Sequence, residues 1–333
     1  MIIERFGTLN GQDVLQVSLQ GPDGMAIQVL TWGAVVRDLT VPLASSSQRV
    51  VLGLNSIEDY VAHSPYFGTI VGRYGNRIGK AQFTLDGETY QLDANEGANQ
   101  LHGGTMGFGT RLWSILDYTS HSVTLGLVSE DGDMGYPGRL VATCTYTLLQ
   151  ASRLRIALEA TSDRPTPVNL TTHGYFNLDG SSDISSHELM IAGEYITPTR
   201  PDLIPTGEIT AVAGTDYDFT APRPIHGAQH TLYDINYVLR GPYGELRHAA
   251  TLASRRNGLA MELWTTEPGV QFYDGHLIDI SVNGLDGIQY GRHGGLCLEP
   301  QRFPDSPNNA HFPSSILRPG QVSRQVSELR FAG

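Results

Sequence analysis

Short runs of alternating apolar and polar residues recur along the whole chain. In residues 153–160, RLRIALEA, every second residue from Leu154 to Ala160 is apolar, and residues 140–148 alternate in the same way. Alternation with a period of two predicts strands that bury one face. Similar runs lie at residues 14–19, 25–31, 34–41, 122–128, 259–265 and 322–331.

Turn-forming pairs separate these runs, and helical signals are sparse. Asp-Gly, Asn-Gly and Pro-Gly pairs favour tight turns. The clearest helix is expected at residues 56–65, where Ser56 can cap the first turn, Asp59 holds the capping-box position and Pro65 ends it. Many strands with few short helices predict an all-β fold, either a sandwich or a barrel. No linker or repeat divides the sequence, so a single domain over residues 1–333 is expected.

The composition narrows the classes of partner. The chain has 22 Lys+Arg against 34 Asp+Glu and a net charge of −12, which argues against nucleic acid and anionic membranes. A neutral polar small molecule suits a protein in which only 17% of residues are charged. The chain lacks a signal-peptide pattern and a long apolar run, and its cysteines, Cys144 and Cys297, form no disulfide framework. We therefore expect a cytoplasmic protein.

Motifs for common cofactors are missing from the sequence. No G-x-G-x-x-G follows a strand, Gly79-Lys80 lacks the rest of a P-loop, and neither His-Glu-x-x-His nor paired Cys-x-x-Cys occurs. A dispersed site of two histidines and a glutamate could still be built from the 11 histidines, although no pattern marks one. We expect no metal and no cofactor. Cys144 lies on an apolar strand face and is expected in the core.

Two glycine-rich segments carry side chains that core packing does not require. In GRYGNRIGKAQF, residues 72–83, Arg73, Asn76 and Arg77 stand among glycines, where they could meet a ligand closely. In NEGANQLHGG, residues 95–104, a histidine precedes two glycines. A polar hairpin loop and a surface histidine are the plain alternatives.

The segment NLTTHGYFNL, residues 169–178, has two interpretations. Asn169 begins an Asn-x-Thr glycosylation motif, which has no use in a protein that is not secreted. As a strand, the segment would place His173, Tyr175 and Asn177 on one face, and Gly174 could mark a bulge that redirects the histidine. A satisfied structural histidine is an equal alternative.

Near the C-terminus, Glu299 is expected on the polar face of a strand, as His173 is in the segment above. Within residues 295–320, Leu296 and Leu298 would point to one side of a strand, and Cys297 and Glu299 to the other. Pro300 is expected to end that strand. Glu299 is then well placed to line a cavity that Cys297 could share, with an ordinary charged strand end as the alternative.

The sequence contains seven motifs in the following order: GRYGNRI, NQLHGG, NLTTHGYFNL, PTGE, YDINYVL, EPGVQFY and CLEPQRFPDSPN. Together they resemble the aldose 1-epimerase (galactose mutarotase) family. The resemblance implies a large antiparallel β-sandwich with a sugar cleft, His173 as general acid and Glu299 as general base. It also implies sugar-binding roles for Asn76, Arg77, His102, Asp234 and Gln271.

Three departures from the family pattern stand near these motifs. Tyr74-Gly75 precedes Asn-Arg, Gly174 follows the histidine, and residues 274–276, Asp-Gly-His, follow the glutamine segment. They could reshape the rim of the cleft, and hence the sugar preference. They leave the acid and the base unchanged.

The implied reaction needs an acid and a base but no redox step, metal or carrier. The base removes the O1 proton while the acid protonates the ring oxygen, and each contributes about 10²–10⁴-fold. For His173 to be charged near neutral pH it needs a nearby anion, which Glu299 or Asp234 could supply. The expected partner is a free monosaccharide such as galactose or glucose, and the protein is expected to be a monomer or homodimer.

Two other functions remain open at this point. One is a non-catalytic sugar-binding or sensing domain on the same fold. The other is a different carbohydrate-active sandwich enzyme, such as a lyase, a hydrolase or a metal-dependent isomerase. A glycoside hydrolase would need two carboxylates at the scissile bond. A pair made of a histidine and a glutamate therefore favours the epimerase.

Overall fold

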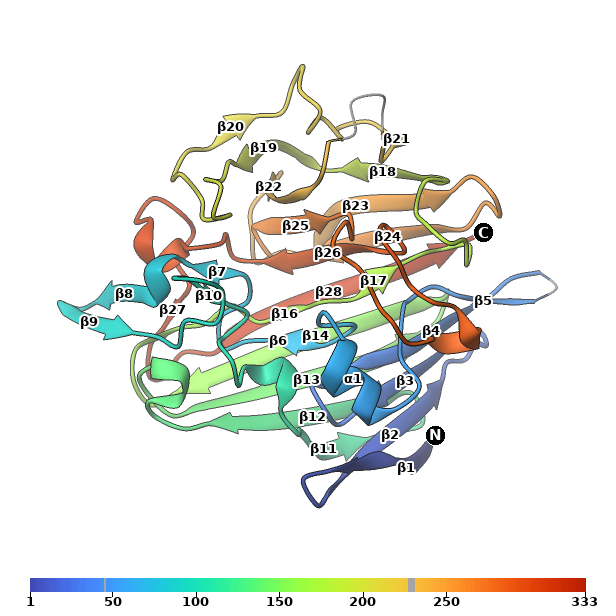
Figure 1. Ribbon diagram of the computed structural model, residues 1–333, viewed down its shortest axis with the longest axis horizontal. Helices are drawn as coiled ribbons and strands as arrows, with labels where there is room; N and C mark the ends of the chain where they lie inside the picture. The colour runs from blue at the N-terminus through green and yellow to red at the C-terminus, as the bar shows by residue number, and fades with distance from the viewer. Residues whose placement is uncertain (45, 227–230) are drawn as a thin grey trace.

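Antiparallel strands are the main secondary structure of the protein, as seen in a computed structural model that describes residues 1–44, 46–226 and 231–333 (Figure 1). Within these residues the only α-helix is α1 (Ile57–His63), where Ser56 Oγ accepts a hydrogen bond from Asp59 N at 3.1 Å. The predicted all-β fold and the predicted helix cap are both confirmed. No helix in the described part of the chain combines the length and the apolar character needed to cross a membrane.

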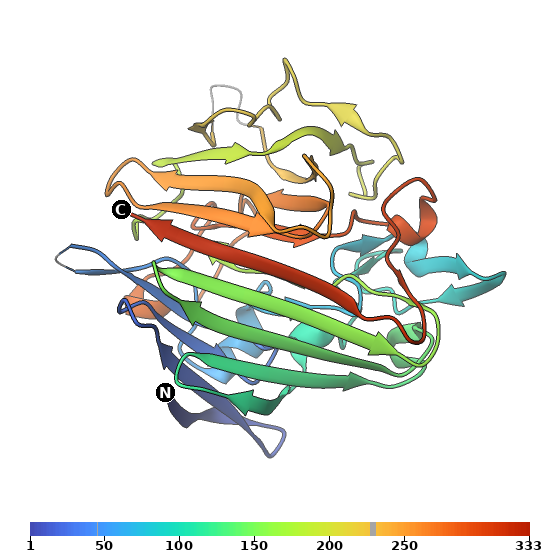
Figure 2. The same cartoon turned by 180° about the vertical axis from the view of Figure 1, so that it is seen from behind.

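A nine-stranded sheet forms one layer of the molecule, and Figure 2 shows it from its outer side. Each of the alternating runs between residues 122 and 160, and both runs after residue 258, is a strand of this sheet. In spatial order the strands are β11 (Ser114–Tyr118), β12 (Ser122–Ser129), β13 (Leu140–Leu149), β14 (Arg153–Ser162), β28 (Ser323–Ala332), β24 (Ala260–Thr265), β23 (Arg247–Ser254), β18 (His187–Ile191) and β21 (Arg223–Pro224).

A six-stranded sheet faces this layer, and a five-stranded sheet contains the N-terminal strands. The six-stranded sheet has the order β17 (Tyr175–Phe176), β26 (Leu296–Gln301), β25 (Gly269–Tyr273), β22 (Asp234–Leu239), β19 (Gly193–Thr197) and β20 (Thr210–Ala211). The five-stranded sheet has the order β1 (Ile2–Leu9), β2 (Gln12–Gln20), β3 (Ala26–Leu30), β4 (Val36–Pro42) and β5 (Ser47–Arg49).

Short strand pairs and single 3-10 turns complete the described elements. The pairs are β7 (Arg77–Ile78) with β10 (Gln100–Leu101), β6 (Ile70–Val71) with β16 (Thr171–Thr172), β8 (Gln82–Leu85) with β9 (Glu88–Gln91), and β15 (Thr166–Pro167) with β27 (Ile316–Leu317). The turns are η1 (Gly79–Ala81), η2 (Phe108–Thr110), η3 (Asp133–Gly135), η4 (Leu285–Gly287) and η5 (Ser306–Asn308).

One apolar core lies between the sheets. Along β13 every second residue is buried, and Cys144 is among them, as predicted. These side chains belong to the same buried cluster as Phe272 on β25 and Leu296 and Leu298 on β26. Burial of both inner faces removes a large apolar area from water, which is the main driving force for such a sandwich.

The structure differs from the sequence prediction at two strands. Residues 169–178 are not one strand, because the chain leaves the β16 pairing at His173 and resumes at Tyr175 in β17, which belongs to another sheet. Pro300 does not end its strand either, since β26 continues to Gln301. β17 pairs with β26 only at Leu296 and Cys297. Pro300 therefore lies beyond that paired stretch, where a missing N–H is tolerated.

Asn169 and Arg73, whose roles the sequence did not decide, both have structural roles. Asn169 is buried; its Nδ2 donates to Gly75 O at 2.9 Å, and its Oδ1 accepts from Arg302 N at 2.8 Å. This burial is incompatible with glycosylation of the folded chain. Arg73 is also buried, and it donates hydrogen bonds to Pro137 O and Gly138 O, both at 2.9 Å. The sequence left contact of Arg73 with a ligand open, but its buried guanidinium is bound to these backbone carbonyls instead.

Candidate active site

The strand register brings residues from distant parts of the sequence into neighbouring rows. Across the sheet, Asp234 is opposite Tyr273, Tyr273 is opposite Cys297, and Cys297 is opposite Tyr175. In the next row on the same face, Gln271 is opposite Glu299. Because side chains alternate along a strand, these two rows build one wall.

A pocket of about 180 Å³ lies against this wall. Six of the seven residues predicted for the sugar site line it, and the seventh, Gln271, does not. Gln271 lies behind the lining, where its Nε2 donates to Asp234 Oδ1 at 2.6 Å. The lining residues are Pro65, Tyr66, Asn76, Arg77, Glu96, Leu101, His102, His173, Tyr175, Asp234, Tyr273, Leu277 and Glu299.

His173 and Glu299 face each other in this pocket. His173 Nε2 lies 3.7 Å from Glu299 Oε1, and only 6% and 3% of the two side chains are exposed. Glu299 Oε2 is buried and has no hydrogen-bond partner among the described residues. A carboxylate oxygen left free beside an imidazole, in a pocket, is available to accept a proton from a ligand hydroxyl.

Neighbouring side chains fix the orientation of the His173 ring. Cys297 Sγ lies 3.5 Å from Nδ1, and the Tyr175 ring stacks on the imidazole with centroids 5.2 Å apart. Contact of Nδ1 with the thiol leaves Nε2 directed toward Glu299. Cys297 therefore adjoins the proposed acid, but it is fully buried behind His173 and is not among the residues that line the pocket.

Burial shifts the pKa values of this pair toward the neutral forms. It lowers the pKa of His173 to about 4. It also raises the pKa of Glu299 well above its ordinary value; Asp234 adds to this effect and Arg77 opposes it. The expectation that a nearby anion keeps His173 charged near neutral pH therefore does not hold for the pocket without sugar. Desolvation outweighs the attraction between the two groups.

Arg77 joins two carboxylates at the edge of the pocket. Its Nε and Nη2 donate to the two oxygens of Glu96 at 2.6 and 2.8 Å. Its Nη1 reaches Asp234 Oδ2 at 3.4 Å. This bidentate geometry fixes the guanidinium and both carboxylates in the orientation that hydroxyl groups of a ligand would meet.

His102 presents one ring nitrogen to the pocket. Its Nδ1 accepts a hydrogen bond from Asn76 N at 3.1 Å. Burial, reinforced by His173 and Arg77, lowers the pKa of His102 well below its ordinary value. The ring is therefore neutral, with its proton on Nε2, and can donate to a ligand oxygen.

Several lining residues were not singled out from the sequence. Glu96 lies in the glycine-rich segment of residues 95–104, but only its pairing with Arg77 in the structure reveals its role. Tyr273 could have been found by strand parity, since it lies two residues after Gln271 on the same face. Tyr66 and Leu277 lie outside the strands, and no sequence signal marks them.

The same pocket has donor atoms that could hold a metal. One donor atom each from His102, His173 and Glu299 lies within 4.8 Å of the other two. Two imidazoles and a carboxylate suit a transition metal. A metal-dependent reaction is therefore the alternative against which acid–base catalysis must be tested.

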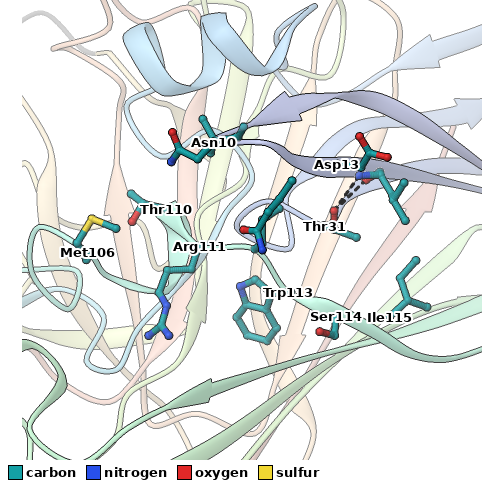
Figure 3. Close-up of a pocket in the computed structure, with 13 residues that line it drawn as sticks. Asn10, Asp13, Thr31, Met106, Thr110, Arg111, Trp113, Ser114 and Ile115 are labelled. Atoms are coloured by element: carbon teal, nitrogen blue, oxygen red, sulfur yellow. Dashed lines mark hydrogen bonds between the residues drawn. The ribbon is translucent and has the colours of Figure 1, made fainter.

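A larger hollow lies elsewhere, between the N-terminal strands and residues 106–115 (Figure 3). Its volume is about 730 Å³. Two of its polar side chains already have partners: Thr31 Oγ1 accepts from Leu15 N at 2.9 Å, and Arg111 pairs with Asp133 at 2.6 Å. It contains no acid–base pair like that of His173 and Glu299, so size alone does not make it the active site.

Comparison with known proteins places the chain in a family. Residues 15–330 match the family model described as Aldose 1-epimerase. The chain is 39% identical to galactose mutarotase of Bos taurus, covering 93% of this chain and 92% of the relative. It is 36% identical to aldose 1-epimerase of Escherichia coli K12, covering 97% and 96%.

Solved structures agree with this match. An aldose epimerase homologue from C. elegans superposes with a TM-score of 0.90 at 29% identity, covering 96% of this chain and 99% of that one. Galactose 1-epimerase from Lactobacillus acidophilus has a TM-score of 0.84 at 27% identity, covering 99% and 98%. The large antiparallel sandwich implied by the motifs is thereby confirmed. The chain belongs to the aldose 1-epimerase family of isomerases.

Proposed function

We propose that this protein interconverts the α and β anomers of free aldoses, with Glu299 as general base and His173 as general acid. The observation that carries the proposal is the buried pair itself, with 3.7 Å between His173 Nε2 and Glu299 Oε1 and a free carboxylate oxygen in the pocket. The names of the relatives, galactose mutarotase and galactose 1-epimerase, point to galactose as a substrate. Glucose is the natural second candidate.

The reaction needs one proton to leave the sugar and one to enter it. Glu299 removes the proton from O1, the C1–O1 bond becomes a carbonyl, and the bond from C1 to the ring oxygen breaks as His173 protonates that oxygen. Rotation about the C1–C2 bond then exposes the other face of the carbonyl. Closure returns both protons through the same pair, so no net proton is exchanged.

The proton inventory of the pair supports this sequence. With the ring closed, the reactive state has an ionised Glu299 and a charged His173; after opening, both are neutral. Burial favours the neutral forms. The pocket is therefore suited to the open-chain stage, and hydrogen bonds from the closed sugar must stabilise the ionic state that precedes it.

The remaining pocket residues are proposed to hold the sugar hydroxyls. His102 Nε2 is a donor, Asn76 and Arg77 lie beside it, and Asp234 is an acceptor kept in place by Gln271. Gln271 thus has a supporting role in this proposal, behind Asp234. One domain over residues 1–333, a cytoplasmic location and a monomer or homodimer are parts of the same proposal.

Polarimetry tests the proposed function. Freshly dissolved α-D-galactose is followed with and without protein, in the presence and absence of EDTA. We expect faster mutarotation that EDTA leaves unchanged. Sugar binding without acceleration would instead identify a binding domain, and acceleration abolished by EDTA would identify a metal-dependent isomerase.

A further inference from the structure

A second group of metal-ligand side chains lies outside the sugar pocket. One donor atom from each of His226, Asp274 and His293 lies within 4.8 Å of the other two. The His226 and His293 rings are 4.3 Å apart between centroids. Asp274 belongs to the Asp-Gly-His departure from the family motif, a feature that the proposed reaction does not use.

Asp274 is held in a fixed orientation by its neighbours. Its side chain is 0% exposed, and Oδ1 accepts hydrogen bonds from His276 Nδ1 at 2.6 Å and His276 N at 3.2 Å. Oδ2 accepts from Tyr233 N at 3.3 Å and lies 3.7 Å from His293 Nδ1. Both oxygens thus accept hydrogen bonds that fix the carboxylate, and Oδ2 also faces His293. Such anchoring of a ligating carboxylate is typical of metal sites.

The group is reachable from solvent. His226 and His293 line a hollow of about 390 Å³, together with Asp183, Ser185, Leu232 and Arg292. The His293 side chain is 19% exposed. A cation can enter from this hollow, and water or a further carboxylate oxygen can complete its coordination.

We propose that His226, Asp274 and His293 bind a divalent transition cation, with Zn²⁺ as the best fit, at a structural site separate from the sugar pocket. Two imidazoles and one carboxylate are a common zinc ligand set, with metal–ligand distances of about 2.0–2.2 Å. Donors that surround such a cation lie about 3.3 Å apart. The three donors now lie within 4.8 Å of one another, so they must move closer together when the cation binds.

The position of the site gives the cation a role. Asp274 directly follows Tyr273, which lines the sugar pocket, and Leu277 lines the pocket three residues later. Leu277 is 75% exposed. A cation bound at Asp274 therefore fixes the turn that carries this rim of the pocket.

Arg292 opposes cation binding, so a variant at this position provides a second test of the proposal. Its Nε donates to His293 Nε2 at 3.2 Å, while His293 Nδ1 faces Asp274 O at 3.0 Å. A cation on Nδ1 requires the ring proton on Nε2, so the exposed guanidinium must turn away. Arg292→Gln is therefore expected to bind the cation at least as tightly as the wild type.

Equilibrium dialysis of EDTA-stripped protein against Zn²⁺ tests the site. The wild type is expected to bind an equivalent of Zn²⁺ whose affinity falls tenfold or more in His226→Gln and His293→Gln. Glu299→Gln, which removes the possible ligand in the sugar pocket, and His63→Gln on α1 should retain it. Zn²⁺ should also raise the melting temperature of the wild type but not of the two ligand variants.

Two outcomes would overturn the proposal. One is a wild type whose melting temperature and dialysis show no Zn²⁺ binding. The other is binding that survives in both ligand variants or that disappears in Glu299→Gln, because either result places the cation elsewhere. The Zn²⁺ affinity of the Arg292→Gln variant provides a test that does not depend on removing a metal ligand. Mutarotation of the stripped protein is measured separately, so failure here leaves the proposed function untouched.

Discussion

At the scale of single residues, the proposed chemistry depends on two buried groups whose pKa values are shifted in opposite directions. The pKa of His173 falls to about 4 and that of Glu299 rises, in each case because burial disfavours the charged form. Over the pH range between these values, the pair as a whole holds one proton. One proton is what the reaction requires, because one group must accept while the other donates.

The pH dependence of kcat/KM should show this shared proton. The rate is expected to fall below about pH 4, where the pair takes up a second proton and the base is lost. It should fall again on the alkaline side, above the ordinary pKa of a glutamate, where the pair loses its proton and the acid is lost. Mutarotation rates measured by polarimetry from about pH 3.5 to about pH 9 test this expectation. An acid limb near 6.5, the pKa of a solvated histidine, would contradict the assignment.

Sequence reasoning at this scale named the proposed acid and base but not the contacts that support them. Strand parity marked His173 and Glu299 only as candidates, and the family resemblance implied their roles as acid and base. The pairing of Arg77 with Glu96 and the support of Asp234 by Gln271 join segments far apart in sequence. Local pattern carries no information about such contacts, so Gln271 was expected to touch sugar rather than to stand behind Asp234.

At the scale of elements, the break between β16 and β17 positions His173, the proposed acid. His173 leaves one two-stranded pairing before the chain joins the six-stranded sheet at Tyr175. His173 N donates to Thr69 O and Gly68 N donates to His173 O, both at 2.9 Å. The histidine is therefore held by backbone bonds outside both strands, where its side chain can enter the pocket.

Arg73 is the structural member of the neighbouring GRYGNR motif. Its guanidinium joins residues 129–130 to Pro137 and Gly138, and burial lowers its pKa to about 10. Arg73→Met leaves these carbonyl acceptors without a donor. The expected cost is about 3 kcal/mol or more in free energy of unfolding, with kcat changed only slightly.

Urea denaturation and mutarotation of the same samples separate these effects. Arg256→Met, on the exposed turn before β24, is the matched control and should lie within about 0.5 kcal/mol of the wild type. A folded Arg73→Met protein with wild-type stability and a large loss of kcat would make Arg73 a site residue after all.

The alternation of apolar residues predicted most elements because one face of each long strand is buried in a common core. The eight alternating runs all became strands. The structure differs from the predicted strands at Pro300 and at His173, and each difference has its own cause. Pro300 was expected to end its strand, but β17 covers only part of that edge. The switch of sheets at His173 depends on which strand pairs with which, and parity does not encode partner choice.

At the scale of the whole molecule, the sandwich encloses titratable groups in neutral form. His102 is buried beside the pair, and its pKa is lowered well below that of a solvated histidine, mainly by desolvation. On unfolding, such a histidine regains a pKa of about 6.5 and binds a proton below that pH. Its contribution to stability is therefore complete above pH 6.5 and is lost as the pH falls.

Acid should consequently destabilise the wild type more than a variant without this histidine. Each pH unit below 6.5 removes up to about 1.4 kcal/mol per buried neutral histidine. Urea denaturation at pH 7 and pH 5 is expected to show a larger loss in the wild type than in His102→Gln. His311→Gln, at an exposed position, should behave as the wild type. Equal losses in wild type and His102→Gln would mean that His102 titrates freely in the fold.

The central claim is that His173 and Glu299 act as one acid–base unit, and a double-variant comparison tests it most directly. Initial mutarotation rates of α-D-galactose are measured for His173→Gln, Glu299→Gln and the double variant, with far-UV circular dichroism to establish folding. Each single change should lower kcat by about 10²–10⁴-fold, and the double variant should be little worse than the poorer single variant. A single variant with the wild-type rate, or single losses that multiply in the double variant, would contradict the account.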